Sequence, residues 1–237
     1  MLLAIDVGNT NTVLGLFEGE AIEHSWRIKT DARATADEYL LTFRGLLADA
    51  PTITGISVCS TVPSVLLELR QMLARYYAHL PTVIVAPGIR TGVSVKVDTP
   101  KEVGADRIVN TLAVHERYGG PAIVVDFGTS TNLDVVSADG DFLGGALAPG
   151  IQISLDALAA RAAQLRKVEL VPPRSAIGKN TVEALQSGAI YGFAGQVDGL
   201  VRRVSAELGD PVAVVATGGL AGIVVPESST ITHHDPD

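Results

Sequence analysis

The sequence predicts an α/β protein built from two related halves, each a mixed five-stranded sheet with helices on both faces. Three observations predict it. An apolar run that delivers Asp6 into a turn of Gly, Asn and Thr is repeated at Asp126, about 120 residues later. In each copy the turn opens a meander of three short strands. Hydrophobic residues make up 47% of the 237-residue chain and aromatic residues only 5%, which indicates an aliphatic α/β core.

Composition and charge exclude several classes of protein. The net charge of -8 argues against a nucleic-acid partner, which normally meets a basic face. The single cysteine, Cys59, excludes a disulfide framework and a Cys-rich metal site, and we expect it to be a buried small residue. Asp6 interrupts the first apolar run, and no run approaches the roughly 18 apolar residues of a membrane span. We therefore expect a cytoplasmic protein that has no membrane partner.

The first half is expected to contain five strands and two helices. Thr35 is a candidate N-cap and Glu38 follows three residues later, which completes a capping box. Pro63 suits the first turn of the second helix. The expected strands are 1–5, 13–17, 21–28, 53–59 and 82–86, and the expected helices are 35–47 and 63–79. Three antiparallel strands followed by alternating helices and strands is the order of a ribonuclease-H-like domain.

The second half repeats this order after a connector at 87–100 that contains two glycines and two prolines. The predicted domains are therefore residues 1–100 and residues 101–237. The expected helices are 101–118, 151–165 and 181–208, and the expected strands are 122–126, 131–136, 142–147 and 212–216.

The Asp6 turn has the composition of a phosphate-binding turn. Backbone N–H groups in a glycine-containing turn can point at phosphate oxygens, and Asn9, Thr10 and Thr12 add side-chain donors. Asp6 repels phosphate, but it can hold Mg²⁺ through water, and Mg²⁺ bridges nucleotide phosphates. A single turn of this kind is equally an ordinary hairpin in which Asp and Asn bond to their own backbone. The second copy makes the functional interpretation the stronger one.

The Asp126 turn is the second candidate phosphate site, and we expect the two turns to clasp a β,γ-diphosphate from both sides. Thr217, Gly218 and Gly219 form a third turn, between a predicted strand and a predicted helix. Glycine there allows a flat adenine ring to lie on the backbone, although a Gly-Gly turn alone is common.

Asp106 and Arg107 are the best chemical pair outside the turns. Near a helix N-terminus they could simply be solvated charges. As functional groups, Asp106 is suited to accept the proton of an attacking alcohol, and Arg107 to form a bidentate contact with a substrate carboxylate.

The long helix 181–208 carries glycines at 188, 192, 195 and 199, spaced along one face. Each costs roughly 1 kcal/mol relative to alanine, so a neighbouring backbone is expected to approach closely. That neighbour is either the protein's own sheet or the same helix of a second copy.

Other common sites are absent from the sequence: Gly178-Lys179-Asn180 is not a Walker loop, and neither a G-x-G-x-x-G fingerprint nor a G-x-S-x-G elbow occurs. His233 and His234 lie in a polar tail and are expected to be solvated.

Five motifs, read in order, resemble the type III pantothenate kinases, and the paired turns with the terminal Thr-Gly-Gly resemble the actin and sugar-kinase superfamily of ATP-binding proteins. The resemblance runs from residue 2 to about 235, and five spaced motifs are far more specific than any one of them. The motifs lie at residues 6–10, 87–92, 104–107, 126–129 and 145–150.

This resemblance implies duplicated ribonuclease-H-like (actin-like ATPase) domains and ATP-dependent phosphorylation of pantothenate to 4'-phosphopantothenate, the first step of coenzyme A biosynthesis. It implies Mg²⁺ with ATP, a monovalent cation (K⁺ or NH₄⁺) at Asp126, Asp106 as the general base, and a homodimer whose active site lies at the subunit boundary. Thr181 is expected to reach pantothenate from the neighbouring subunit. The implied ATP-binding residues are Asp6, Val7, Gly8, Asn9, Thr10, Asn11, Thr12, Val13 and Thr129, and the implied pantothenate-binding residues are Gly104, Ala105, Asp106, Arg107 and Thr181.

The chain departs from the family pattern at two positions close to these motifs. Val97 stands where the family often has a tyrosine, and Asn132 stands at a frequent threonine position. Two alternative functions remain at this stage. One is a non-catalytic nucleotide-binding regulator of the Bvg accessory factor type. The other is a different phosphotransferase or phosphohydrolase on the actin-like fold.

Overall fold

The structure is a computed structural model that describes residues 1–86, 88–162, 168–209 and 211–236. The chain divides into two compact units, residues 1–91 with 101–109, and residues 92–100 with 110–237. Each unit contains one five-stranded mixed sheet, which confirms the predicted fold class. Residues 101–109 group with the first unit, whereas the predicted domains divide the chain at residue 100, so those limits stay a prediction.

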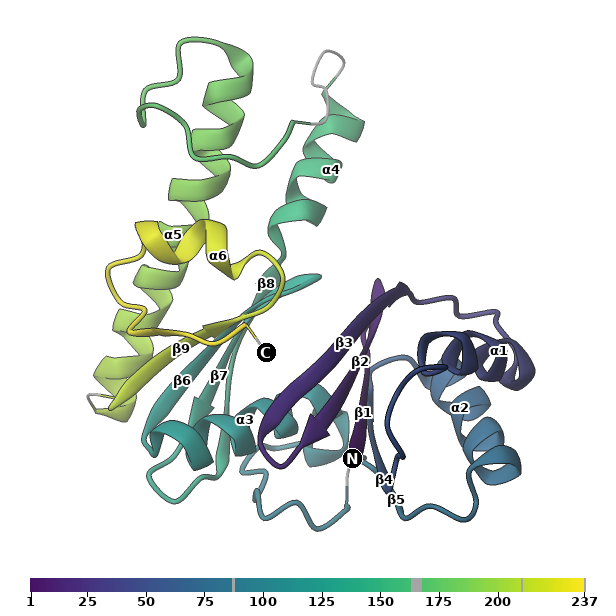
Figure 1. The fold of residues 1–237 in the computed structure, drawn as a ribbon. Coiled ribbons are helices and arrows are strands. Elements are labelled where there is room, and N and C mark those ends of the chain that lie inside the picture. The colour runs from purple at the N-terminus through teal and green to yellow at the C-terminus, as the bar shows by residue number, and fades with distance from the viewer. Residues whose placement is uncertain (87, 163–167, 210, 237) are drawn as a thin grey trace. The chain divides into compact units, whose positions relative to one another are not determined.

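The sheet of the first unit has the order β3-β2-β1-β4-β5 (Figure 1). β1, β2 and β3 form the predicted antiparallel meander, and β4 and β5 then add in parallel. The strands are β1 (Leu2–Val7), β2 (Asn11–Glu18), β3 (Ala21–Lys29), β4 (Gly55–Ser60) and β5 (Thr82–Ile84).

Two helices, α1 (Ala36–Leu46) and α2 (Pro63–Tyr76), cover one face of this sheet. Alternate residues of the central strands point at them, because successive side chains of a strand face opposite sides of the sheet. Leu3, Ile5 and Val7 of β1 are thereby almost completely buried in an aliphatic core. The opposite face of β1 carries Ala4 and Asp6.

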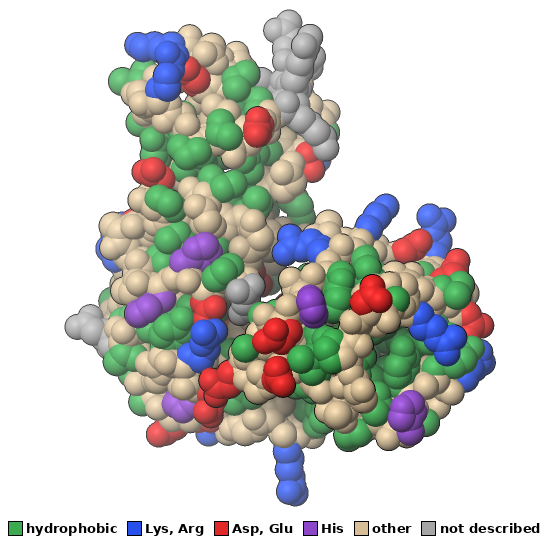
Figure 2. Space-filling model, viewed as in Figure 1, with side chains coloured by type: hydrophobic (Ala, Val, Ile, Leu, Met, Phe, Trp, Pro, Cys, Tyr) green, Lys and Arg blue, Asp and Glu red, His purple; other side chains and the backbone are tan. Residues whose placement is uncertain are grey.

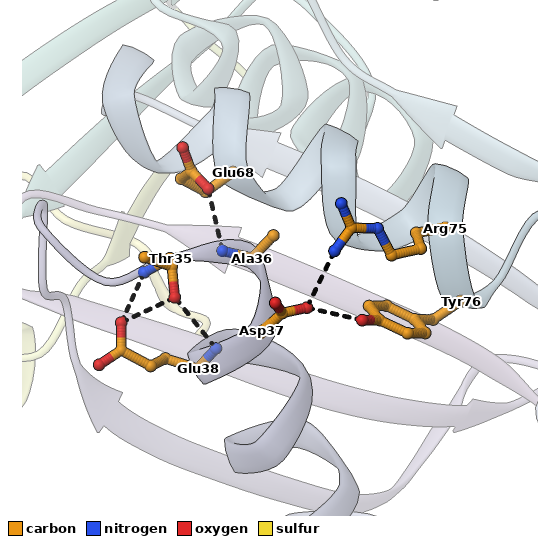
Figure 3. Close-up of polar contacts among 7 residues, drawn as sticks. All are labelled: Thr35, Ala36, Asp37, Glu38, Glu68, Arg75 and Tyr76. Atoms are coloured by element: carbon orange, nitrogen blue, oxygen red, sulfur yellow. Dashed lines mark hydrogen bonds and ion pairs between the residues drawn. The ribbon is translucent and has the colours of Figure 1, made fainter.

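The start of α1 confirms the predicted capping box (Figure 3). The Thr35 hydroxyl oxygen accepts from the Glu38 backbone N–H at 3.4 Å, and the Glu38 carboxylate accepts from the Thr35 N–H at 2.8 Å. Glu68 of α2 accepts from the Ala36 N–H at 2.9 Å. Protein side chains therefore satisfy the donors at the start of α1 and tie it to α2.

The sheet of the second unit has the order β10-β9-β6-β7-β8, which matches β5-β4-β1-β2-β3 strand for strand. β6, β7 and β8 are antiparallel neighbours, and β9 and β10 add in parallel. This correspondence confirms the duplication inferred from the two turns. The strands are β6 (Ala122–Phe127), β7 (Ser130–Val136), β8 (Phe142–Pro149), β9 (Ala213–Thr217) and β10 (His233–His234).

Helices lie on both faces of the second sheet. The helices α4 (Ile151–Arg161), α5 (Thr181–Leu208) and α6 (Ala221–Val224) pack on one face, through residues that include Ile151, Val197 and Val224. On the other face, Val114 and Tyr118 of α3 (Ala105–Tyr118) pack against β6, β7 and β9. Two short 3-10 helices complete the structure, η1 (Pro100–Glu102) and η2 (Val225–Glu227). Within the described ranges, the search for a helix with the length and hydropathy of a membrane span found none.

Asp198 fastens α5 to the chain after η2. Its carboxylate accepts hydrogen bonds from the backbone N–H groups and hydroxyls of Ser229 and Thr230, and from the Ser228 hydroxyl. Burial opposes the ionisation of Asp198, but these donors together outweigh it and hold the pKa of Asp198 below its usual range. A buried carboxylate with this many donors is a strong local clasp.

Three sequence-based predictions differ from the structure. The helix expected from residue 101 begins at Ala105, because Pro100–Glu102 form a 3-10 turn and Gly104 precedes the helix. The helix expected to reach residue 165 ends at Arg161 with an extended Ala162, and residues 163–165 lie outside the described part of the chain. His233 and His234 form the edge strand β10 instead of a tail, although both are exposed.

Candidate active site

The Asp6 turn connects β1 to β2 as predicted. The Gly8 N–H donates to the Asn11 carbonyl at 3.0 Å, which closes the turn. Asn9, Thr10 and Asn11 are exposed at its tip. Thr12 is completely buried and its hydroxyl lies 2.9 Å from that of Thr30, so it is engaged within the protein. This differs from the expected role of Thr12 as a side-chain donor to phosphate.

Asp6 and Asp106 are brought near each other within the first unit. Desolvation raises the pKa of Asp6, even though part of the residue is exposed, and the charge of Asp106 raises that pKa further. The candidate magnesium carboxylate and the candidate base therefore share one electrostatic environment. The sequence around Asp6 and the sequence around Asp106 gave no sign that the two carboxylates lie near each other.

Cys59 lies on β4 directly opposite Asp6 of β1. Desolvation, followed by the charges of Asp6 and Asp106, raises the pKa of Cys59 to about 12. A half-buried thiol of this kind stays protonated at neutral pH and is a poor nucleophile. Cys59 was expected to be buried, and the structure leaves it partly exposed.

Asp106 lies in the first turn of α3, and Arg107 follows it. The place that a Cβ of Gly104 would occupy is taken by the Asp106 carboxylate, which therefore folds back over residue 104. A side chain at residue 104 would therefore collide with the Asp106 carboxylate. The predicted pantothenate contacts of these residues stay a prediction.

The Asp126 turn joins β6 to β7 in the second unit. The Gly128 N–H donates to the Ser130 carbonyl at 3.0 Å, and the Gly150 N–H donates to the Thr129 carbonyl at 3.1 Å. A Cβ on Gly150 would lie 2.6 Å from the Gly128 carbonyl oxygen, so the start of α4 packs directly on this turn. Gly150, the last residue of the motif at 145–150, therefore supports the Asp126 turn.

The third glycine turn also packs on the Asp126 turn. Gly218 has a φ of 92°, and a Cβ there would lie 2.5 Å from Asp126 Oδ1 and 2.7 Å from the Phe127 backbone. The Leu220 N–H donates to the Phe127 carbonyl at 3.3 Å. The structure therefore brings Gly218 and Gly219, expected near adenine, to the carboxylate expected to hold a cation.

Asn132 pairs with Asp126 across β6 and β7, so both side chains point to the same face. Asn132 is 6% exposed, and its Oδ1 has no hydrogen-bond partner among the described residues. An oxygen that lacks a donor beside a carboxylate suits a hard cation. Over the described part of the chain, no cluster of three or more His, Cys, Asp or Glu side chains is able to hold a metal alone.

Thr181 is the first residue of α5 and is exposed. The Asn180 side chain caps the helix by accepting from the Glu183 N–H at 2.9 Å, and Glu183 in turn accepts from the Lys179 N–H and pairs with Arg174. The preceding loop is therefore fixed onto the helix start, so Thr181 is presented at a defined place.

The glycines of α5 do not pack against the sheet. A Cβ on Gly188, Gly192 or Gly195 would have nothing within 4 Å, and all three are exposed. Packing on the protein's own sheet is therefore wrong for these three. Hydrophobic side chains are exposed in the upper part of the view in Figure 2, and the exposed large hydrophobic residues of α4 and α5 are Ile153, Leu158 and Val182.

Comparison with known proteins gives the same family over nearly the whole chain. A model of the family described as type III pantothenate kinase matches residues 2–203. A type III pantothenate kinase from Frankia alni is 69% identical over 236 residues, covering 100% of this chain and 94% of its own. One from Salinispora arenicola is 67% identical over 237 residues with the same coverage.

Solved structures agree on the fold alone, because their sequence identities are low. An activator of 2-hydroxyisocaproyl-CoA dehydratase from Clostridium difficile, with bound ADPNP, has a TM-score of 0.55 at 14% identity, covering 99% of this chain and 88% of its own. A ROK family protein from Streptococcus pneumoniae has a TM-score of 0.54 at 16% identity, covering 95% and 85%.

Proposed function

The chain belongs to the type III pantothenate kinase family, and from this premise we propose how its residues carry out the reaction. The protein is an enzyme, a kinase that phosphorylates pantothenate in coenzyme A biosynthesis. The observation that carries the proposed mechanism is the electrostatic proximity of Asp6 and Asp106 in one unit. This proximity brings the proposed phosphate-binding turn close to the proposed base for the acceptor alcohol.

Asp106 is the proposed general base. In a loose phosphoryl-transfer transition state such a carboxylate mainly orients the attacking hydroxyl and accepts its proton late. Arg107 and the backbone of Gly104 and Ala105 are proposed to bind pantothenate, with the guanidinium directed at its carboxylate.

The Asp6 turn, residues 6–13, is proposed to bind the ATP phosphates. Thr129 and the Gly218-Gly219 turn are also proposed to bind ATP. Mg²⁺ fits at Asp6, because a divalent cation would relieve the repulsion between Asp6 and Asp106. A bound Mg²⁺ would supply charge neutralisation at the phosphates. A monovalent cation, K⁺ or NH₄⁺, fits at Asp126, where Asn132 Oδ1 offers a second oxygen.

We test the mechanism by turnover with Mg-ATP, K⁺ and pantothenate. Wild type yields phosphopantothenate, and Asp106→Asn lowers kcat by about 100-fold or more, since general-base groups contribute roughly that much. Asp49→Asn, at an exposed position away from the turns, is the matched control and keeps the wild-type rate. A near-wild-type rate in Asp106→Asn would remove Asp106 from this role. ATP hydrolysis without any acceptor would favour a phosphohydrolase.

A homodimer that completes each site with Thr181 of the other subunit is the second part of the proposal. The exposed glycine face of α5 and the exposed apolar residues beside it support an interface with a second copy. Mixing the impaired Asp106→Asn and Thr181→Ala proteins tests it. If Thr181 acts across the interface, mixed dimers hold one intact site and restore about a quarter of the wild-type activity. No recovery after verified subunit exchange would place Thr181 in its own subunit's site.

A further inference from the structure

Thr30, the residue after β3, makes two contacts with the Asp6 turn. Its hydroxyl donates to the Gly8 carbonyl at 2.8 Å, and its backbone N–H donates to the Thr10 carbonyl at 3.0 Å. Thr30 is 8% exposed, and the bond from its hydroxyl to the Gly8 carbonyl is partly buried. Two carbonyls of the turn are therefore fixed by one residue that lies outside it.

The direction of each hydrogen bond follows from the number of protons. A threonine hydroxyl carries one proton, and that of Thr30 goes to the Gly8 carbonyl. The 2.9 Å bond between the Thr12 and Thr30 hydroxyls must then be donated by Thr12. The chain of donors runs from Thr12 to Thr30 to Gly8, and bonds arranged in such a chain strengthen one another.

Fixing a carbonyl also fixes the N–H group of the same peptide plane. The peptide bond is planar and trans, so the N–H points opposite to the carbonyl. With the Gly8 carbonyl held by Thr30, the Asn9 N–H points to the side away from Thr30. Thr30 also holds the Thr10 carbonyl, so the Asn11 N–H likewise points to the side away from Thr30. Asn9 and Asn11 are, together with Thr10, the exposed residues of the turn, where phosphate oxygens would be bound.

We propose that Thr30 is a positioning residue for ATP: it orients the backbone donors of the Asp6 turn and makes no contact with the nucleotide itself. This rests on the proposed function, in which that turn binds the ATP phosphates. Thr12 acts in the same unit as the donor that holds the Thr30 hydroxyl. Its side chain is thus a support for the turn.

Steady-state kinetics and thermal unfolding of matched variants test the proposal. Thr30→Val keeps the side-chain shape and removes the hydroxyl, and we expect KM for ATP to rise about tenfold, while kcat and KM for pantothenate change less than about threefold. Thr30→Ser keeps the hydroxyl and restores KM for ATP. Thr54→Val is the control, because the Thr54 hydroxyl donates at 3.1 Å to the Met1 carbonyl at the opposite end of β1. It leaves KM for ATP unchanged.

The Thr12→Val/Thr30→Val double variant separates positioning from stability. Thr30→Val alone leaves the buried Thr12 donor without its acceptor, and replacing both partners removes that penalty. We expect the Tm of the double variant to recover relative to Thr30→Val while KM for ATP stays raised. A KM for ATP that recovers with Tm, or that never rises in Thr30→Val, overturns the proposal. Direct calorimetric binding of Mg-ATP to wild type is measured first, and its absence would instead overturn the assignment of the turn to ATP.

Discussion

The Asp6 turn of the first unit and the Asp126 turn of the second share a sequence pattern, but the neighbouring chain supports them in different ways. Side-chain hydroxyls support the first: Thr30 holds the Gly8 carbonyl, and Thr61 donates through its N–H and hydroxyl to the Val7 carbonyl. Backbone packing supports the second, because Gly150 and Gly218 approach it more closely than any side chain allows. A hydroxyl can be exchanged with modest rearrangement, whereas such backbone contacts tolerate no added atom.

The helices that follow the two meanders, α1 and α4, also differ in whether side chains or backbone contacts support their first turns. α1 begins with a complete capping box, and Glu68 of α2 accepts from its Ala36 N–H. α4, its counterpart, has Gly150 as its N-cap, with no side-chain cap and no acidic residue in its first turn, among the residues described. Side chains accept from the N–H groups at the start of α1, while the start of α4 packs on the backbone of the Asp126 turn. The two halves share one topology, but in the second half backbone segments pack directly on the turn.

Gly218→Ala gives the largest expected effect. The added methyl group meets the Phe127 backbone and Asp126 Oδ1, and the φ of 92° is unfavourable for alanine. We expect a loss of about 3 to 4 kcal/mol in the free energy of unfolding, from the left-handed conformation and the overpacking together. Urea denaturation measures it. The matched change Gly8→Ala, whose Cβ would lie 3.3 Å from the Asn11 carbonyl, costs clearly less. Equal losses would mean that the two turns are supported alike.

Asp198→Asn is expected to cost about 2 to 3 kcal/mol, because the Ser228–Thr230 donors lose a charged acceptor. The pKa of Asp198 is lowered in the folded state, so its contribution is fully present above the unfolded pKa near 3.8. That contribution is lost as pH falls from there toward the folded pKa. Unfolding of wild type and variant should therefore converge in acid. A difference that is constant between pH 7 and pH 3 would contradict the ionised carboxylate as its source.

Much of this architecture follows from the sequence, because it rests on local patterns. The period-2 apolar runs, the Thr35–Glu38 capping box and the repeated Asp-x-Gly turns each report on a few neighbouring residues. The support of the turns depends on residues far apart in the chain, such as Thr30 with Gly8 or Gly218 with Asp126, which only the strand order brings together. An isolated threonine at the end of a strand carries no signal of that kind. The edge strand β10 was not predicted for a similar reason, since two exposed histidines show no strand pattern.

Thr35→Ala tests the first unit where its protein-made capping is clearest. The change removes the hydroxyl that accepts from the Glu38 N–H, and N-cap losses of this type cost about 1 kcal/mol. Thr35→Ser, which keeps the oxygen, should retain most of the stability in the same thermal unfolding measurement. ATP binding should be unaffected in both, because α1 covers the face of the sheet opposite Asp6. A change in KM for ATP would show that the capping box also supports the Asp6 turn.

Asp6→Asn gives the smallest expected change in stability, and its sign is opposite to the others. The raised pKa of Asp6 means that its contribution is present below the unfolded pKa and lost as pH rises through the folded pKa. At pH 7 the ionised carboxylate therefore opposes folding, and asparagine should stabilise the protein by about 0.5 kcal/mol after allowance for solvent screening. Thermal unfolding without Mg²⁺ or nucleotide should show this gain at pH 7 and none below pH 4. A separate activity assay should show a loss of turnover. A lower Tm at pH 7 would contradict charge repulsion at this turn. Electrostatic strain would then not distinguish the Asp6 turn from the glycine-packed turn at Asp126.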